Sequence, residues 1–321
     1  MSDDQKLEER LEALRSSPSL GKAAGKLGLH TTALSRYFAR RGITPSEYLG
    51  TESPFTKRTG PDVAKVEPRP VREVTRILVC SDAHHPYVDR LAWNTFLAAG
   101  RDIRPDVLVI IGDFADCYSV SAHRKDPNRR AMIQEELDSC NTALDELDEL
   151  RAPVKVFCSG NHESRLPRYI ADKAPEISSL VRTIPQYFRL AERGWEWVPY
   201  QSFKRIGKVA FTHDVGRSGV NTARQSLVDF GGNLFVGHSH RGGVAYQGTV
   251  DHDPHFCVNV GWLGDLDSID YVHKARAARD WQHGFGYATQ TADGMTWGQF
   301  IPILNGRCVV DGRVITGRVA A

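Results

Sequence analysis

The sequence lacks the features that mark secreted or membrane-spanning proteins. Its six cysteines include no C-x-x-C pair, so a thiolate zinc site is not expected. No apolar run approaches the length needed to cross a membrane. The first residues, Met1 to Gln5, are polar and acidic, so we do not expect a signal peptide. These absences predict a protein of the reducing cytoplasm with no membrane partner.

An excess of charge of one sign is also lacking. The 41 Lys and Arg residues nearly balance 39 Asp and Glu residues, which leaves a formal net charge of +2. That value is too small to argue for nucleic-acid binding by itself. Internal repeats and low-complexity tracts are missing as well. The 321 residues are enough for one large domain and a small one.

An apolar run in the middle of the chain leads directly into a carboxylate. Residues 107–111 are five apolar, mostly β-branched residues, which predicts a buried strand in a parallel sheet. Gly112 ends the strand. Asp113 then follows at the edge where open α/β sheets place their ligands. Taken alone, this stretch favours the interpretation of Asp113 as a helix N-cap that follows a strand.

Four further apolar runs end in the same manner, each with Asp, Asn or His directly after the strand. These are the donors of catalytic metal sites. The runs are residues 76–80 before Ser81-Asp82-Ala83-His84, residues 154–158 before Ser159-Gly160-Asn161-His162-Glu163, residues 209–211 before Thr212-His213, and residues 233–236 before Gly237-His238-Ser239-His240.

Along the chain, the motifs occur in the order D-x-H, G-D-x-x-D, G-N-H-E, a single H and G-H-x-H. With these motifs in this order, residues 76–300 resemble the calcineurin-like metallophosphoesterases. The resemblance implies an α/β (α+β) fold, a four-layer β-sandwich flanked by helices, in a catalytic domain at residues 73–321. Helices are predicted at residues 89–101 and 132–150 between the first three strands.

Short strands past residue 240 are expected to form the second sheet of the sandwich. They are predicted at residues 244–250, 255–260, 286–290 and 296–301. The aromatic stretch from Trp195 to Tyr200 favours packing at a sheet edge over a cap above the site.

The resemblance also implies a site for two divalent ions. Asp82, His84 and His240 would hold one ion, Asn161, His213 and His238 the other, and Asp113 would be shared. His238 and His240 would share a face on an ideal strand, so a turn at the strand end must send them to different ions. The mixed nitrogen and oxygen donors favour Mn²⁺, with Fe or Zn²⁺ as alternatives.

His162 follows Asn161 and is not counted among the ligands. In the family this position contacts the substrate and is proposed to protonate the leaving group, a task that suits a histidine. Arg165 is expected to meet a phosphate oxygen or to pair with Glu163. Asp116 is expected to support the site or cap a helix rather than to bind an ion.

A polar loop, residues 119–130, follows the G-D-x-x-D turn and is expected to overhang the metal site. Two interpretations are open for it, a clamp on a phosphate backbone or an ordinary basic surface loop. Its basic side chains are Arg124, Lys125, Arg129 and Arg130.

The N-terminal 50 residues predict three short helices, at residues 5–16, after Ser19 and from Thr31 or Thr32. Residues 18–49 resemble one helix-turn-helix of an AraC-type regulator. Between Ala13 and Gly50 there are six basic residues and one acid. The side chains expected to touch DNA are Thr32, Ser35, Arg36 and Arg40.

A protein-binding module remains the alternative for this head, because the resembling regulators carry two such units and this chain has one. Residues 51–72 hold four prolines and predict a linker between the head, residues 1–50, and the catalytic domain.

The predicted function is the hydrolysis of phosphodiester bonds in DNA, which would be both the substrate and the binding partner. The serine/threonine phosphatase branch of the family has G-D-x-x-D-R-G, whereas Cys117 and Tyr118 follow Asp116 here. The basic loop and the head favour a nuclease of a bacterium or bacteriophage. One alternative is a phosphomonoesterase or small-nucleotide phosphodiesterase that the head localises. Another is a non-catalytic DNA-binding regulator, against which the intact ligand set argues.

Overall fold

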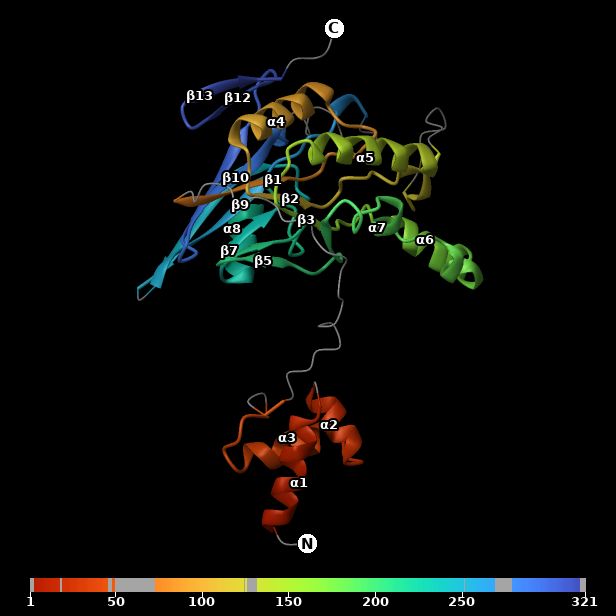
Figure 1. Cartoon of the computed structure of the whole chain (residues 1–321), viewed down its shortest axis with the longest axis vertical. Coiled ribbons are helices and arrows are strands. Elements are labelled where there is room, and N and C mark those ends of the chain that lie inside the picture. Colours follow the sequence, from red (N-terminus) through yellow and green to blue (C-terminus); the bar gives the residue numbers. More distant parts are fainter. Residues whose placement is uncertain are drawn as a thin grey trace. The chain divides into compact units, whose positions relative to one another are not determined.

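The computed structural model describes residues 3–17, 19–45, 48–49, 73–123, 125, 132–250, 252–268 and 279–317. The chain divides into two compact units, Met1–Pro70 and Val71–Ala321, which are drawn in Figure 1. The predicted linker, residues 51–72, lies outside the described residues. Among the helices described, none is long and apolar enough to cross a membrane.

The smaller unit contains the three predicted helices, α1 (Asp3–Arg15), α2 (Leu20–Lys26) and α3 (Thr31–Ala39). The Ser19 hydroxyl caps α2 by accepting a hydrogen bond from the backbone N–H of Lys22 at 3.3 Å. The core of this unit is built from all three helices. It consists of Leu11, Ala13, Leu14, Ala23, Ala24, Leu34 and Phe38.

The larger unit contains a six-stranded sheet in the order β11-β10-β1-β2-β3-β4. Strands β1 to β4 run parallel, and β10 lies antiparallel to β1. Crossover helices α4 (Arg90–Ile103) and α5 (Ile133–Asp148) connect the first three strands, as predicted. The strands are β1 (Val74–Cys80), β2 (Val107–Ile111), β3 (Val154–Cys158), β4 (Trp195–Val198), β10 (Gly284–Thr291) and β11 (Thr296–Pro302).

The second sheet has five strands in the order β5-β6-β7-β9-β8. We predicted that residues 286–290 and 296–301 belong to this sheet, and that prediction is wrong. Strand β10 instead pairs along β1, with Val74 opposite Thr291, and carries β11 into the first sheet. The strands are β5 (Lys204–Ile206), β6 (Val209–Phe211), β7 (Asn233–Val236), β8 (Gly242–Thr249) and β9 (His252–Val260).

The two sheets pack face to face, and helices cover both outer faces (Figure 1). Apolar side chains of both sheets, such as Val109 of β2 and Phe235 of β7, form the core between them. Helices α4 and α5 bury their apolar faces on the six-stranded sheet, and α8 (Thr222–Phe230) covers the five-stranded sheet. The larger unit therefore has the four layers that we predicted.

Smaller elements complete the unit. Strand β4 is an edge strand, which confirms the sheet-edge interpretation of the Trp195 stretch. Helices α6 (Arg165–Lys173) and α7 (Ile184–Tyr187) lie between β3 and β4. A C-terminal hairpin of β12 (Arg307–Val310) and β13 (Arg313–Thr316) had no counterpart in the prediction.

Candidate metal centre and active site

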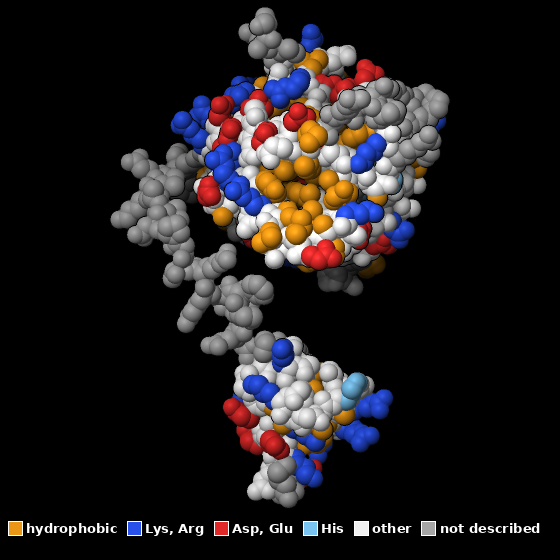
Figure 2. Space-filling view, turned by 90° about the vertical axis from the view of Figure 1, so that its right-hand side faces the viewer, with side chains coloured by type: hydrophobic (Ala, Val, Ile, Leu, Met, Phe, Trp, Pro, Cys, Tyr) orange, Lys and Arg blue, Asp and Glu red, His pale blue; other side chains and the backbone are white. Residues whose placement is uncertain are grey.

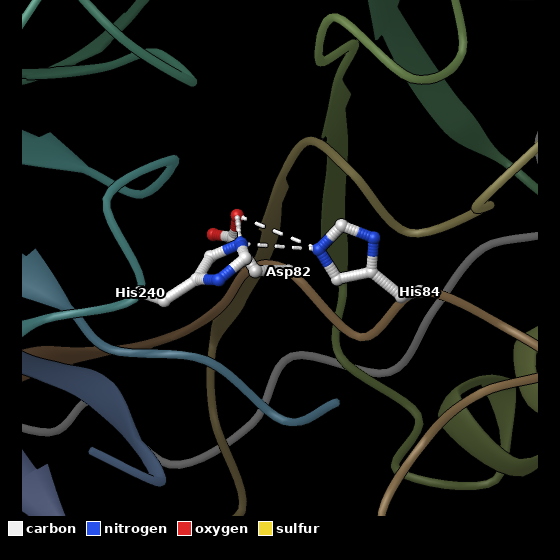
Figure 3. A group of neighbouring side chains, drawn as sticks. All are labelled: Asp82, His84 and His240. Carbon is white, nitrogen blue, oxygen red and sulfur yellow. Dashed lines mark hydrogen bonds and ion pairs between the residues drawn. The ribbon is translucent and has the colours of Figure 1, made fainter. Parts of the chain in front are cut away.

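The loops that follow five strands of the two sheets bring together all seven predicted ligands. The first cluster, called the Asp82 group, consists of Asp82, His84 and His240. The Nε2 atoms of His84 and His240 are 3.2 Å apart. Asp82 Oδ1 lies 3.2 Å from Nε2 of His240 and 3.9 Å from Nε2 of His84. Figure 3 shows the three side chains converging from the loops after β1 and β7.

The hydrogen bonding of the Asp82 group is incomplete. Asp82 Oδ1 is buried and has no hydrogen-bond partner among the described residues. His84 turns its Nδ1 to the Asp116 carboxylate at 3.0 Å, which leaves an Nε2 lone pair facing the group. A single N–H of His240 can satisfy His84 or Asp82, but not both. A cation between the three atoms would satisfy all of them.

The second cluster, called the Asp113 group, consists of Asp113, Asn161, His213 and His238. Nε2 of His213 lies 3.2 Å from Asp113 Oδ2, 2.9 Å from Asn161 Oδ1 and 3.2 Å from His238 Nδ1. Asn161 Oδ1 is 3.0 Å from His238 Nδ1. His213 uses its Nδ1 to donate to the Ile111 carbonyl at 2.9 Å, which directs Nε2 into the group.

Left-handed backbone turns at the strand ends aim these side chains. Five of the seven residues have positive φ: Asp82 at 53°, His84 at 51°, Asp113 at 48°, His238 at 65° and His240 at 59°. Non-glycine residues rarely adopt this conformation, and it concentrates at functional sites. The turns send His238 to the Asp113 group and His240 to the Asp82 group, as the prediction required.

Glycines allow the loops to approach one another. A Cβ at Gly160 would overlap the Asp113 carboxylate, and a Cβ at Gly237 would overlap the side chains of Ser81 and Asp82. The close approach of the loops therefore requires glycine at these positions of the G-N-H-E and G-H-x-H motifs.

A third cluster, which involves His162, Asp116 and Arg165, adjoins the Asp113 group. His162 Nδ1 lies 2.9 Å from Asp116 Oδ1 and 3.0 Å from the Asp116 carbonyl oxygen, so Nδ1 must be the protonated nitrogen. Its Nε2 lies 3.6 Å from Asp113 Oδ2 and 2.8 Å from Nη2 of Arg165. Asp116 thereby holds both His84 and His162, which matches the supporting role predicted for it.

Glu163 has a structural role that we did not predict. Its Oε1 accepts hydrogen bonds from the N–H groups of Phe114 and Ala115 at 2.7 and 2.9 Å. Its Oε2 accepts from the N–H groups of Asp113 and Gly160 at 3.0 and 2.7 Å. The carboxylate therefore ties the loop after β2 to the loop after β3. Arg165 pairs with His162 and Asp116 instead of Glu163.

Buried charge dominates the electrostatics of the site. Burial opposes ionisation of Asp82 and Asp113, but neighbouring histidines outweigh it and lower the pKa of both carboxyls. Burial lowers the pKa of His213, but the Asp113 carboxylate more than offsets this and raises the pKa to about 10. Buried carboxylates of low pKa require compensating positive charge, which is what a metal site supplies.

A cavity of about 530 Å³ opens over both groups. Asp113, Asn161, His162 and Arg165 line it. Four further lining residues were not named as site residues: one belongs to the loop that was expected to overhang the metal site, and three lie outside the strand-end motifs. They are His123, Ser218, Arg241 and Trp281.

Of the predicted substrate-binding loop, Arg124, Arg129 and Arg130 lie outside the described residues. Lys125 is exposed, and its Nζ donates to the Ser119 carbonyl. His123 of the same loop reaches the cavity.

The four predicted DNA-contacting residues of the smaller unit are all exposed. They are Thr32, Ser35, Arg36 and Arg40 on or just after α3. Arg41 is occupied, since its guanidinium lies 3.9 Å from the ring centre of Tyr37 and 2.5 Å from an oxygen of Asp3.

A second cavity, of about 360 Å³, lies beside α6 and α7 and is mostly apolar, with Leu166, Ile170 and Trp197 in its lining. Figure 2, viewed from the side on which Figure 1 places α6 and α7, shows hydrophobic side chains gathered there. Neither donor group lines this cavity, so the chemistry belongs to the first one.

The fold and the two donor groups are those of a metal-dependent hydrolase. Residues 75–289 match the family described as "Calcineurin-like phosphoesterase", and the chain belongs to this family. It is a metal-dependent phosphoesterase.

Two phage proteins are similar to this chain. The Gene 54 protein of Mycobacterium phage L5 is 29% identical over 266 residues, which covers 74% of this chain and 98% of the phage protein. The Gene 54 protein of Mycobacterium phage D29 is 28% identical over 263 residues, with coverage of 74% and 98%. Among solved structures, a single mutant of Vps29 from Entamoeba histolytica is 13% identical, with a TM-score of 0.39 and coverage of 76% of this chain and 98% of that one.

Proposed function

We propose that this chain is a phosphodiesterase that cleaves DNA with the help of two divalent metal ions. Mn²⁺ is the favoured metal, and Fe or Zn²⁺ are the alternatives. The observation that carries the proposal is the pair of adjacent donor groups, in which buried acceptor atoms face one another without enough N–H donors. Carboxylate, imidazole and amide donors in this mixture suit these metals.

The Asp82 group would hold one ion. Asn161, His213 and His238 would hold the other, with Asp113 shared between them. When bound, two such ions stabilise the charge that develops on a phosphoryl group during displacement and lower the pKa of the attacking water. The positive φ at five of these positions supports the assignment, because such strain persists where function requires the geometry.

His162 would exchange a proton with the leaving group through Nε2. Its Nδ1 is committed to Asp116 at 2.9 Å, so only Nε2 can take part in proton transfer to the substrate. An arginine can only donate, and Arg165 occupies Nε2 at 2.8 Å. The proton-donor role therefore requires Arg165 to leave His162, and a phosphate oxygen is the kind of anion that draws a guanidinium away.

DNA as substrate is supported by the smaller unit. Arg36 and Arg40 form no ion pair with any residue that the structure describes, in contrast to Arg41. Their exposure beside Thr32 and Ser35 fits a helix that contacts phosphates and base edges, as in an AraC-type helix-turn-helix. The head would then concentrate the catalytic unit on DNA.

A small phosphoester is the second candidate substrate, and the cavity favours it. A volume of about 530 Å³ is within the range of small-molecule sites. In this case the head would only determine where the enzyme acts.

A substrate panel with Mn²⁺ tests the proposal. It compares single- and double-stranded DNA, RNA, cyclic nucleotides, a phosphomonoester and a generic diester. DNA cleavage that exceeds turnover of the small esters at equal phosphate concentration supports the nuclease. Turnover of small esters alone supports the second candidate. No hydrolysis of any ester, together with tight DNA binding, would favour a non-catalytic regulator.

A further inference from the structure

A smaller cavity, of about 210 Å³, has no place in the chemistry described so far. It lies at the start of α8, and we call it the α8 cavity. Asn221, Thr222 and Arg224 line it from the start of that helix, and Asn259 of β9 lines it as well. Arg241 lines both the α8 cavity and the cavity over the donor groups. The two cavities are therefore neighbours that share one side chain.

Positive charge is in excess at the α8 cavity. The described residues that line it include two arginines, Arg224 and Arg241, and no acid. Arg224 donates to the Tyr246 carbonyl at 2.7 Å and forms no ion pair with a residue that the structure describes. Nη2 of Arg241 lies 3.3 Å from an Asp280 oxygen, but the same carboxylate also pairs with Arg279 at 3.0 Å. One negative charge is thus divided between two arginines.

Two buried polar groups at the α8 cavity lack a hydrogen-bond partner among the described residues. One is the Nε–H of Arg241. The other is Oδ1 of Asn259, a residue that is 2% exposed and whose Nδ2 donates to the Ser239 hydroxyl. Turned by 180°, this amide would accept from the same hydroxyl and present its NH₂ group instead. Buried polar groups are normally hydrogen-bonded, so the cavity is expected to hold an occupant.

The start of α8 adds further donors. The side chain of its N-cap residue, Asn221, makes no capping hydrogen bond. The first N–H groups of a helix have no partner within the helix and carry partial positive charge. Phosphate groups commonly bind there. An anion would therefore meet the helix start, two arginines and a buried amide in one cavity, whereas a water molecule would leave the charge of the arginines uncompensated.

We infer that the α8 cavity binds a second phosphate group of the substrate, with Arg241 placed between this phosphate and the one at the donor groups. Guanidinium and amide N–H groups match the oxygens of a phosphate. The inference rests on the proposed function and deepens it, because it requires a substrate that carries at least two phosphates. The second phosphate is either the next linkage of a nucleic-acid strand or the phosphorylated end of a nucleotide.

Thymidine trinucleotides that differ by one charge provide the test. The natural trinucleotide has two phosphodiester linkages, and in each of two analogues one linkage is replaced by an uncharged methylphosphonate. The intact full chain is assayed with Mn²⁺, and the products identify the linkage that is cleaved. The quantity measured is the ratio of kcat/KM for one phosphodiester in the natural trinucleotide to that for the same linkage in the analogue. This ratio does not depend on the fraction of folded enzyme.

For one of the two analogues, the ratio is expected to be about 10- to 100-fold, because the analogue loses a charge-assisted hydrogen bond. Arg241→Gln should bring this ratio close to one. Asn259→Asp should lower it as well, because a carboxylate repels a phosphate. Arg101→Gln is the matched control for lost charge. Arg101 lies on α4 outside both linings and pairs with Glu149 at 3.4 Å, so the ratio should stay as in the intact chain.

Two results with the trinucleotides would overturn the inference. One is a ratio near one for both analogues in the intact chain. The other is an Arg241→Gln variant that loses the same factor for the natural trinucleotide and the analogue, so that the ratio stays high. Arg241 would then only hold the loops around the Asp82 group.

Binding measurements separate this inference from the proposed function and identify the source of the phosphate. Thymidine 3′,5′-bisphosphate and thymidine 5′-monophosphate are titrated into the full chain with Mn²⁺. Tighter binding of the bisphosphate that is lost in Arg241→Gln supports a terminal phosphate in the α8 cavity, whether or not the chain hydrolyses a trinucleotide. Equal binding, together with a high trinucleotide ratio, assigns the cavity to a strand linkage. If no trinucleotide is hydrolysed, the proposed cleavage of DNA fails, and equal binding of the two nucleotides then contradicts the second phosphate site too.

Discussion

At the scale of single residues, the state of His162 decides how the site handles protons. Asp116 fixes the proton on Nδ1, and Arg165 points a donor at Nε2 from 2.8 Å. Burial lowers the pKa of His162, although the Asp113 charge opposes this. In this arrangement the imidazole is neutral, and it becomes a proton donor only after gaining a proton at Nε2.

Replacing His162 should separate metal binding from proton transfer. His162→Ala is expected to keep the bound ions and to lower kcat by about 10²- to 10⁴-fold for a diester with a poor leaving group. The loss should shrink for p-nitrophenolate, which departs without a proton. Paired rate measurements on the two diesters, with metal analysis of the same samples, check this.

The control is His255→Ala, because His255 is half-buried on β9 and outside the cavity lining. Its rates should match those of the intact chain. An equal loss for both leaving groups in His162→Ala would contradict the proton-transfer role.

At the scale of elements, the site depends on loops that approach closely at the strand ends. Glu163 ties the loops after β2 and β3 through four backbone N–H groups. Gly160 lies where any side chain would collide with the Asp113 carboxylate. The geometry of the Asp113 group is therefore a property of two loops together.

Adding one methyl group at this contact should damage the metal site. Gly160→Ala is expected to displace Asp113 and to weaken Mn²⁺ binding by about 10- to 100-fold, as do other changes that reorient a ligand. Isothermal titration with Mn²⁺ measures the affinity. Gly243→Ala is the matched control, because a Cβ there meets nothing within 4 Å. Equal Mn²⁺ affinity in the two variants would contradict the predicted contact.

The sequence predicted the strand ends well because their signal is local. An apolar run followed by Asp or His is visible in a few residues, and each such run, for example Val107 to Asp113, forms a strand and a ligand-bearing loop. The pairing between strands, in contrast, does not depend on local sequence. The pairing of β10 with β1 joins residues about two hundred positions apart in the chain, and no local pattern specifies it.

The missed residues share a physical reason. Glu163 was read as part of a motif, but its four N–H donors come from two loops that meet only in the fold. Arg241 and Trp281 reach the cavity from positions that follow no strand-end pattern. Their roles depend on loop paths, which composition and spacing do not fix.

In the molecule as a whole, the chain divides into two compact units, Met1–Pro70 and Val71–Ala321. All seven proposed ligands belong to the larger unit, and the proposed DNA contacts belong to the smaller one. If the smaller unit anchors the enzyme to DNA, the two activities should be separable.

A chain that starts at residue 72 should keep Mn²⁺ binding and turnover of a small diester, yet bind duplex DNA more weakly, because tethering raises effective concentration. In the full chain, Arg36→Ala with Arg40→Ala should reproduce part of this loss and flatten the salt dependence. Gel-shift titrations at several salt concentrations measure both effects.

Arg15→Ala serves as the control for lost charge, since Arg15 lies on α1 and pairs with Glu8 at 2.9 Å. Unchanged DNA affinity after truncation would point to the protein-binding interpretation of the head.

The proposed function depends above all on the sharing of Asp113 between two ions that the chain needs for hydrolysis. Calorimetric titration of the metal-free protein with Mn²⁺, run beside an assay of a generic diester, tests it most directly. We expect two ions to bind per intact chain. In Asp113→Asn we expect the loss of at least one ion and a rate lowered by about 10²-fold or more. Two tightly bound ions and an undiminished rate in Asp113→Asn would contradict it.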